Sequence, residues 1–420
     1  MLNRHQAPLL QKLSAVKVKE VESIVFNNGL HIYSINSSTQ PVVKLEVLFP
    51  TGGNYYEIKP GTSMLCLYFL KEGTLSYNSR EIANALAYYG AQLQVNPSFD
   101  APSIGLLCLS KHIHQLLPYL KEILMSPVFP ENEFDSLKRL HIQNLKTQQK
   151  KNNVQASKHF RNSLYGNDNP YGKLITIEDL ENVTIQDIKE FYQLNLQNFE
   201  LLMSGDVAGL LPVLESTFKD YQNSIADFKP FKDFKIQSTK TYSNAIDSSV
   251  QTSIRVGKRF IPKTNPDYHK VYIANHILGG YFGSRLMKNI REDKGYTYGI
   301  YSSLVNLQYD SYLIIASDVI KESVEDSLYQ INKEILDLKN NLITLDELDT
   351  VKQHLIGSFQ SGITTPFSLI SKFKNIHMYG LDYDFYENHI STIQSITLED
   401  LKETYNQYFD ESDMTTVSVG

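Results

Sequence analysis

The 420-residue sequence predicts an α+β protein made of two tandem copies of one domain, each a largely antiparallel sheet with helices packed on one face. The first observation behind this prediction is the length, which exceeds what one hydrophobic core usually fills. The second is an internal repeat. The third is the presence of strand-like alternation and long helical periods in the same copy, which favours an antiparallel sheet over a doubly wound parallel one.

The internal repeat is visible in two pairs of segments. Residues 183–192, VTIQDIKEFY, match residues 396–405, ITLEDLKETY, at a spacing of 213 residues. Residues 132–138, NEFDSLK, match residues 346–352, DELDTVK, at a spacing of 214 residues. Because two separate segments report nearly the same spacing, the second half of the chain is a copy of the first.

Each copy carries strand and helix patterns. Residues 43–49, VKLEVLF, alternate between apolar and polar side chains as a half-buried strand does. Residues 110–127 place apolar side chains three and four apart, which predicts a helix. The polar segment 230–249 keeps no helical period, so we expect a domain boundary near residue 235, with domains at 1–235 and 236–420.

Composition excludes several classes of protein. Lys and Arg number 40 and Asp and Glu 46, for a net charge of −6, and the basic residues are spread along the chain. Nucleic acid and membrane are therefore not expected as partners. No apolar run has the length of a signal peptide or a membrane span, so a cytoplasmic protein is expected. Cys66 and Cys108 each lie between leucines, which indicates two small core residues rather than a disulfide.

The segment 61–74, GTSMLCLYFLKEGT, predicts a helix of about three turns over residues 61–73. Thr62 or Ser63 can cap its start, and Gly73 can end it. Positions 64, 67 and 68 then share one face, because side chains three and four residues apart on a helix are neighbours.

This segment, read with its upstream residues as FPTGGNYYEIKPGTSMLCLYFLKEGT, resembles the zinc helix of the pitrilysin and mitochondrial-processing-peptidase family, the inverted zincins. That helix carries H-x-x-E-H in the frame G-x-x-H-x-x-E-H-x-x-x-x-G-T. The resemblance places Met64 and Tyr68 where the family has its two zinc-binding histidines, and Leu67 where it has the catalytic glutamate. We therefore expect Met64 and Leu67 to be largely buried, with the Tyr68 hydroxyl turned to a polar neighbour or to the chamber.

The family's third zinc ligand is a glutamate on a later helix. The resemblance places it within residues 129–148, at or beside Gln143 and Asn144, neither of which is a carboxylate. Amide oxygens are poor zinc ligands. The resemblance thus implies that this chain binds no metal or other cofactor of its own.

The eleven histidines offer no obvious replacement site. His112 and His114, the only close pair, are two residues apart and so lie on different faces of a helix. His141, His276 and His354 stand alone in the sequence and are interpreted as ordinary hydrogen-bonding histidines.

Residues 88–109, YYGAQLQVNPSFDAPSIGLLCL, are similar to the family's strand beside the zinc helix, which pairs with extended peptide substrate. The resemblance implies that Gly90, Ala91, Gln92 and Leu93 bind substrate. A hairpin of the core explains the same pattern, and the two interpretations stay open.

Residues 276–303 match the family's C-terminal-domain segment, in which an Arg and a Tyr lie seven residues apart, here Arg291 and Tyr298. The resemblance implies that both side chains bind substrate carbonyls and stabilise the oxyanion that forms during attack. The alternative is a helix-end salt bridge for Arg291 and a core position in a strand for Tyr298.

Together these features lead to one functional hypothesis. In some two-subunit members of the family, one subunit carries H-x-x-E-H and the other the Arg and Tyr. By this resemblance the chain is the non-zinc subunit of a two-subunit zinc metalloendopeptidase. It is expected to be inactive alone, and the zinc is expected in a homologous H-x-x-E-H-bearing partner subunit.

Two alternatives remain beside that hypothesis. The first is a catalytically inert peptide-binding or scaffold protein of the same fold. The second, a self-sufficient peptidase, is disfavoured by the missing base and ligands. Whether the isolated chain forms a homodimer stays open.

Overall fold

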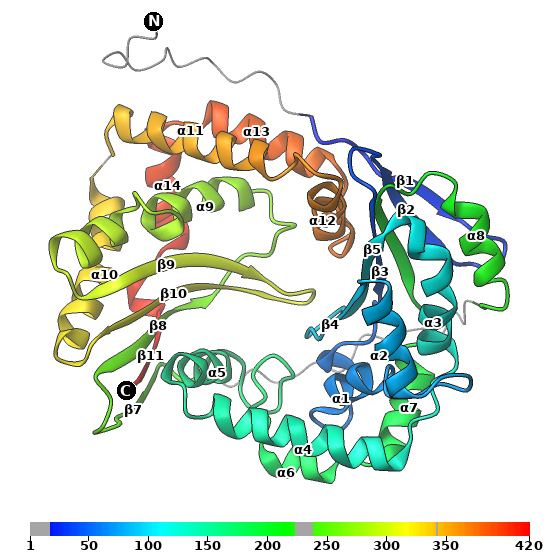
Figure 1. Ribbon diagram of the computed structural model, residues 1–420. Coiled ribbons are helices and arrows are strands. Elements are labelled where there is room, and N and C mark those ends of the chain that lie inside the picture. Colours follow the sequence, from blue (N-terminus) through cyan, green and yellow to red (C-terminus); the bar gives the residue numbers. More distant parts are fainter. Residues whose placement is uncertain (1–16, 223–237, 342) are drawn as a thin grey trace, which may run out of the picture.

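The computed structural model describes residues 17–222, 238–341 and 343–420. The chain forms two halves, each built on one sheet, which lie side by side in Figure 1. The expected boundary near residue 235 lies outside the described residues. Within the polar segment 230–249, residues 241–244 form a short strand. The sequence showed no helical period there and did not predict this strand.

The first half contains a six-stranded sheet with the order β1-β2-β6-β3-β5-β4. Four of its five strand pairs are antiparallel, and β2 with β6 is parallel. Its strands are β1 (Glu22–Val25), β2 (His31–Asn36), β3 (Val42–Leu48), β4 (Gln92–Asn96), β5 (Ser103–Leu109) and β6 (Glu200–Gly205).

The second half contains a five-stranded sheet with the order β7-β11-β8-β10-β9. Its strands are β7 (Thr241–Asn244), β8 (Gln251–Arg259), β9 (Thr297–Asn306), β10 (Ser311–Ile320) and β11 (Thr415–Val419). Strand for strand, this order repeats the order from β2 to β4 of the first sheet, including one parallel pair at the same place. The predicted α+β class and tandem duplication are confirmed.

Helices of its own half cover one face of each sheet, and a helix of the other half covers the opposite face (Figure 1). Those of the first half are α1 (Thr62–Phe69), α2 (Ser79–Tyr88), α3 (Ile113–Met125), α4 (Glu131–Gln148), α5 (Asn152–Tyr165), α6 (Ile177–Asn182), α7 (Ile185–Asn195) and α8 (Leu210–Thr217), with 3₁₀ turns at Asn54–Tyr56 and Ser110–His112. Those of the second half are α9 (Tyr268–Asn275), α10 (Val324–Asn340), α11 (Leu345–Ser361), α12 (Pro366–His377), α13 (Asp384–Ser395) and α14 (Leu398–Tyr408). Short π-helical turns at His276–Gly280 and Met287–Asp293 and 3₁₀ turns at Lys321–Ser323 and Glu411–Asp413 complete the second half.

The repeated sequence segments form equivalent helices. The VTIQDIKEFY and ITLEDLKETY segments become α7 and α14, which begin with the same capping box, Thr184 with Asp187 and Thr397 with Asp400. The two cysteines are buried and free, as the sequence predicted. None of the described helices is both long and apolar enough to cross a bilayer.

One helix of each half packs on the sheet of the other half. Helix α5 lies on β8 and β11, and α12 lies on β2 and β6. The two helices are equivalent by the repeat, since α5 begins at residue 152 and α12 at residue 366, which is 214 residues later. Each buries an apolar cluster against the sheet it crosses to, with Phe160 and Tyr165 in one cluster and Ile370 and Phe373 in the other.

Charged groups strengthen the contact between α12 and the first sheet. Glu46 of β3 is 5% exposed, and its carboxylate oxygens lie 2.5 Å from Lys374 Nζ of α12 and 3.0 Å from Lys44 Nζ. Glu200 of β6 lies 2.8 Å from His377 Nε2. Because Glu46 is buried, its charge depends on both lysines being in place.

Acidification should weaken this contact. Burial alone would raise the pKa of Glu46, but Lys374 and Lys44 lower it from 4.5 to about 2. The ionised carboxylate therefore stabilises the fold fully above pH 4.5, and this stabilisation is lost as the pH falls from there toward 2. The shift corresponds to on the order of 3 kcal/mol.

We expect Glu46→Gln to remove this part of the pH dependence, measured as the free energy of urea unfolding between neutral pH and about pH 2. Glu403→Gln, on the exposed face of α14, is the matched control and should unfold like the wild type at each pH. Parallel pH profiles for the wild type and Glu46→Gln would contradict this role.

Candidate functional site

The glycines and acid around the degenerate helix α1 have structural tasks. Both Glu57 carboxylate oxygens accept backbone N–H groups at the start of α1, from Gly61 and Ser63, each at 2.9 Å. The Ser63 hydroxyl donates to the Gly52 carbonyl at 2.6 Å. Gly61 has φ +91°, and a Cβ there would lie 2.5 Å from a methyl group of Leu180. The family frame thus holds the helix start in place without any metal.

The predicted helix limits need correction. Helix α1 spans Thr62–Phe69, about two turns rather than the three expected over residues 61–73. Neither Thr62 nor Ser63 caps it, because the Glu57 carboxylate occupies the first-turn N–H groups. Gly73 lies beyond the helix end, in a bridge with Asn78.

The three positions of the lost zinc motif are packed to different degrees. Leu67 is fully buried at 0% exposure, as predicted, whereas Met64 is only half-buried. Tyr68 is also half-buried and its ring lies 4.7 Å from the His141 ring of α4, but its hydroxyl hydrogen-bonds to none of the described residues. Leu67 and Tyr68 differ in burial because adjacent residues on a helix point about 100° apart, so Leu67 points into the core and Tyr68 toward its edge.

The expected third-ligand position is also different. Gln143 and Asn144 are exposed, whereas His141 lies against Tyr68 and Leu145 packs on the core. The reason is helical geometry, because residues four apart share the face of α4 that turns to α1, and residues 143 and 144 fall outside it. Within the described ranges, no group of three His, Cys, Asp or Glu side chains could hold a metal ion, so the residues present do not fit the family's zinc.

The predicted substrate strand lies at a sheet edge. Gly90, at φ +61°, ends α2, and β4 pairs with β5 alone among the described strands. Ala91 and Leu93 pack on the core, while Gln92 is exposed. An open strand edge can accept an extended peptide, so substrate binding at Gly90, Ala91, Gln92 and Leu93 stays a prediction.

Arg291 and Tyr298 lie together. The Arg291 Nε donates to the Tyr298 carbonyl at 3.1 Å, and the guanidinium lies 4.5 Å from the ring centre of Phe282. Tyr298 is 92% exposed, so the alternative of a core tyrosine is wrong. The nearest carboxylate to Arg291 is that of its neighbour Glu292 at 3.8 Å, an exposed pair that contributes little to stability.

Tyr298 lies at an irregularity in the pairing of two strands. The pairing of β9 with β10 shifts between Ser317 and Val319, opposite Tyr298 and Gly299. Such bulges re-aim a side chain at the end of a strand. The bulge and the hydrogen bond from Arg291 to the Tyr298 carbonyl fix the backbone at this position, where the Tyr298 side chain is exposed.

The Arg291 and Tyr298 pair lies far from α1 of its own chain. The tip of the β9–β10 hairpin reaches the first half, where Gln308 N donates to Asp100 at 3.0 Å and the Tyr309 and Tyr56 hydroxyls lie 2.7 Å apart. Tyr298 sits at the opposite end of β9, roughly 30 Å along the strand. Figure 1 shows this separation, with the hairpin tip near α1 and the start of β9 beside α10.

Two pairs of neighbouring histidines were not predicted from the sequence. His276 Nε2 lies 3.0 Å from His354 Nδ1, and the Nδ1 atoms of His389 and His269 lie 3.3 Å apart. Burial lowers the pKa of His269 and His276 to about 4 and that of His389 to about 3. His276 and His354 therefore do not stand alone, and their 78-residue separation in sequence is why periodicity could not pair them.

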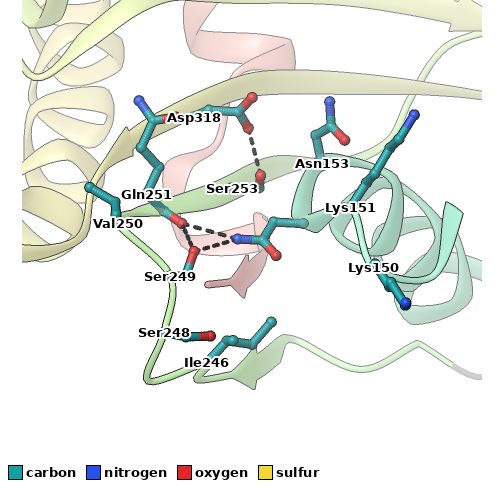
Figure 2. A pocket seen from close by; sticks show the side chains of 11 residues that line it. Lys150, Lys151, Asn153, Ile246, Ser248, Ser249, Val250, Gln251, Ser253 and Asp318 are labelled. Atoms are coloured by element: carbon teal, nitrogen blue, oxygen red, sulfur yellow. Dashed lines mark hydrogen bonds between the residues drawn. The ribbon is translucent and has the colours of Figure 1, made fainter. Parts of the chain in front are cut away.

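A cavity of about 780 Å³ lies where α5 crosses to the second sheet (Figure 2). Its polar groups satisfy one another. Asn152 Nδ2 donates to Ser249 Oγ at 2.7 Å and to the Gln251 carbonyl at 3.1 Å, and Ser253 donates to Asp318 at 2.6 Å. This cavity is a polar seam between the halves, and its Asp318 belongs to the part of β10 that lies opposite Tyr298 and Gly299.

Comparison with known proteins places these features in a family. Residues 31–175 match the family model described as insulinase (peptidase family M16), and residues 182–355 match the model of the peptidase M16 inactive domain. Together the two models cover most of the chain, and they confirm the resemblance found in the sequence.

Individual relatives are distant but cover almost the whole chain. The chain is 23% identical to the non-peptidase homolog YmxG of Helicobacter pylori, over 89% of this chain and 88% of that protein. It is 22% identical to the uncharacterized zinc protease YmxG of Bacillus subtilis, over 91% of this chain and 94% of that protein. A solved protease structure from Helicobacter pylori superposes with a TM-score of 0.86 at 20% identity, covering 96% of this chain and 99% of that one, which shows a common fold.

Glu57→Ala should destabilise the fold, because the N–H groups of Gly61 and Ser63 lose their acceptor. Loss of a helix cap typically costs about 1 kcal/mol, and two bonds are lost here. Urea unfolding measures the change, with Glu403→Ala as the control on an exposed helix face. A Glu57→Ala variant as stable as this control would show that the frame is held by other contacts.

Restoring the zinc-motif residues at positions 64, 67 and 68 should destabilise the fold. Leu67→Glu buries a carboxylate that has no partner and should cost about 3 kcal/mol or more, whereas Met64→His, at a half-buried position, should cost clearly less. The triple variant with Tyr68→His, measured with a chelator present, should be at least as destabilised as Leu67→Glu, because it contains the same buried carboxylate. Unchanged unfolding of Leu67→Glu or of the triple variant would contradict this account.

Proposed function

Because the chain belongs to the peptidase M16 family, we propose that it is the non-zinc subunit of a two-subunit metalloendopeptidase, to which it contributes Arg291 and Tyr298. The observation that carries the proposal is the exposure of Tyr298, at 92%, beside an arginine fixed by the tyrosine's own carbonyl. A tyrosine held at the surface in this way has no packing role to explain it.

The position of the pair supports a site shared between chains. The pair lies at the end of β9 remote from α1, and α1 itself carries Met64, Leu67 and Tyr68 in place of metal ligands. The two side chains would then act at the reactive centre of another chain. The family relation points to a homologous subunit that carries H-x-x-E-H and the zinc.

The chemistry of the pair suits an electrophilic role. A guanidinium stays charged at any working pH, and a tyrosine hydroxyl donates a hydrogen bond from a rigid ring. Both can bind a substrate carbonyl oxygen and stabilise the negative charge that develops on it when the carbonyl is attacked. The open edge of β4 would hold the peptide by backbone hydrogen bonds, which need no particular sequence.

The test is a reconstituted complex with an H-x-x-E-H-bearing homologue from the same source, assayed on an unstructured fluorogenic peptide. The chain alone should contain far less than one zinc per molecule and should not cleave. In the complex, Tyr298→Phe should lower kcat about a hundredfold to a thousandfold, as the loss of one oxyanion donor does. Arg291→Ala should lower kcat similarly and also raise KM.

Tyr329→Phe, at a 63% exposed position on α10, is the control and should keep full activity. Thermal stability and assembly should be unchanged in all three variants. If Tyr298→Phe and Arg291→Ala retain wild-type turnover in an active complex, the inert peptide-binding or scaffold alternative takes precedence.

A further inference from the structure

A second polar site lies in a cavity of about 280 Å³ in the second half, between α9, α11, α12, α13 and the end of β9. Figure 1 shows these elements gathered above the second sheet. The cavity is lined by aromatic side chains together with lysine, asparagine, serine and histidine side chains. The residues that the argument uses are Lys263, Lys372, Asn306, Tyr268, Tyr272 and Phe385.

Two lysines of this cavity have no acidic partner. Lys263 is 6% exposed, and its Nζ donates only to Asn375, to Oδ1 at 2.7 Å and to the carbonyl at 3.3 Å. The Lys372 Nζ lies over the Phe359 ring, 4.9 Å from its centre. Neither ammonium forms an ion pair with a carboxylate of the described residues.

Burial disfavours the charged form of both lysines. Burial and the charge of Lys372 lower the pKa of Lys263 to about 8, and burial lowers the pKa of Lys372. Two like charges beside one cavity with no anion are costly, because buried charges are normally paired. The face of Tyr379, 4.3 Å from the Lys263 Nζ, offsets only part of this cost. An anion in the cavity would complete the pairing.

The cavity also contains an unpaired acceptor. The Asn306 side chain donates from Nδ2 to the Tyr268 hydroxyl at 3.0 Å, while its Oδ1 is buried and has no hydrogen-bond partner. Buried polar atoms without a partner are rare, and this one would accept an N–H group. A ligand that satisfies the site therefore carries an anion and an N–H donor.

We propose that this cavity binds the C-terminal residue of a peptide. The terminal carboxylate would pair with Lys263 and Lys372, the last amide N–H would donate to Asn306 Oδ1, and the last side chain would pack on Tyr272 and Phe385. The peptide nature of the ligand rests on the proposed function, but the binding requires neither the partner subunit nor hydrolysis.

Calorimetric titration of the isolated chain tests the site. The probes are two octapeptides of one sequence that end in phenylalanine, one with a free carboxylate and one amidated, together with N-acetylphenylalanine and 3-phenylpropionate. The free-acid peptide should bind saturably at one site, and amidation should weaken it at least about tenfold, as expected for loss of a charged hydrogen bond. N-acetylphenylalanine should bind more tightly than 3-phenylpropionate, which has the ring and carboxylate but no N–H.

Lys263→Met and Lys372→Met should each weaken the free-acid peptide by at least about tenfold. Lys333→Met, on the exposed face of α10, removes the same charge elsewhere and should leave the affinity unchanged. Without ligand, Lys263→Met should melt at or above the wild-type temperature, because an uncompensated buried charge has been removed. This shows that the variant is folded, and the free-acid peptide should raise the melting temperature of the wild type but not of this variant.

Equal affinity for the acid and amide peptides, or wild-type affinity in both lysine variants, would overturn the proposal. The absence of saturable binding by the free-acid peptide would also overturn it. If N-acetylphenylalanine binds and the peptide does not, the proposal of a peptide ligand is wrong and the ligand is a free acylated amino acid. These titrations measure binding and need no peptide cleavage. An inactive reconstituted complex would therefore contradict the proposed function without contradicting this binding site.

Discussion

The reciprocal packing of α5 and α12 is the contact on which the rest of the molecule depends. Each sheet has helices of its own half on one face, and the other face is covered by the equivalent helix of the opposite half. Burial of Phe160 and Tyr165 on one side and of Phe373 on the other ties the halves through apolar contacts. Because the helices are exchanged, neither half can close its sheet alone. The hairpin tip at Tyr309 and the ion pair of Glu46 add directional contacts to this exchange.

The structural roles of the residues around α1 explain why the chain keeps the frame of a zinc helix without its ligands. Gly61, Glu57 and Ser63 hold the start of α1 by close approach and hydrogen bonds that do not involve the three zinc-motif positions. Met64, Leu67 and Tyr68 occupy positions where the frame demands only side chains that pack. Replacement of ligands by apolar groups removes a wet, charged centre and leaves the backbone unchanged. Frame and chemistry are thus separable in this helix.

Polar groups suited to a ligand are concentrated in the second half. The first half carries a packed α1 and an open strand edge at β4. The second half presents Arg291 beside an exposed Tyr298, and separately a cavity with two unpaired lysines. Both features contain cationic side chains, which suit carbonyl or carboxylate oxygens. The two sites come from different elements, so each can change without the other.

The sequence by itself determined the duplication, because repeat spacing survives in the side chains that start and line α4, α7, α11 and α14. It also determined the strand and helix types and the missing zinc ligands, since periodicity and residue identity are local properties. Tertiary structure decided that α5 and α12 are exchanged, that His141 rather than Gln143 faces Tyr68, and that His276 meets His354. It also decided that Tyr298 is exposed and that two lysines share a cavity with Asn306. These contacts join residues far apart in the chain, and a sequence period reports the face of one element without identifying the element packed against it.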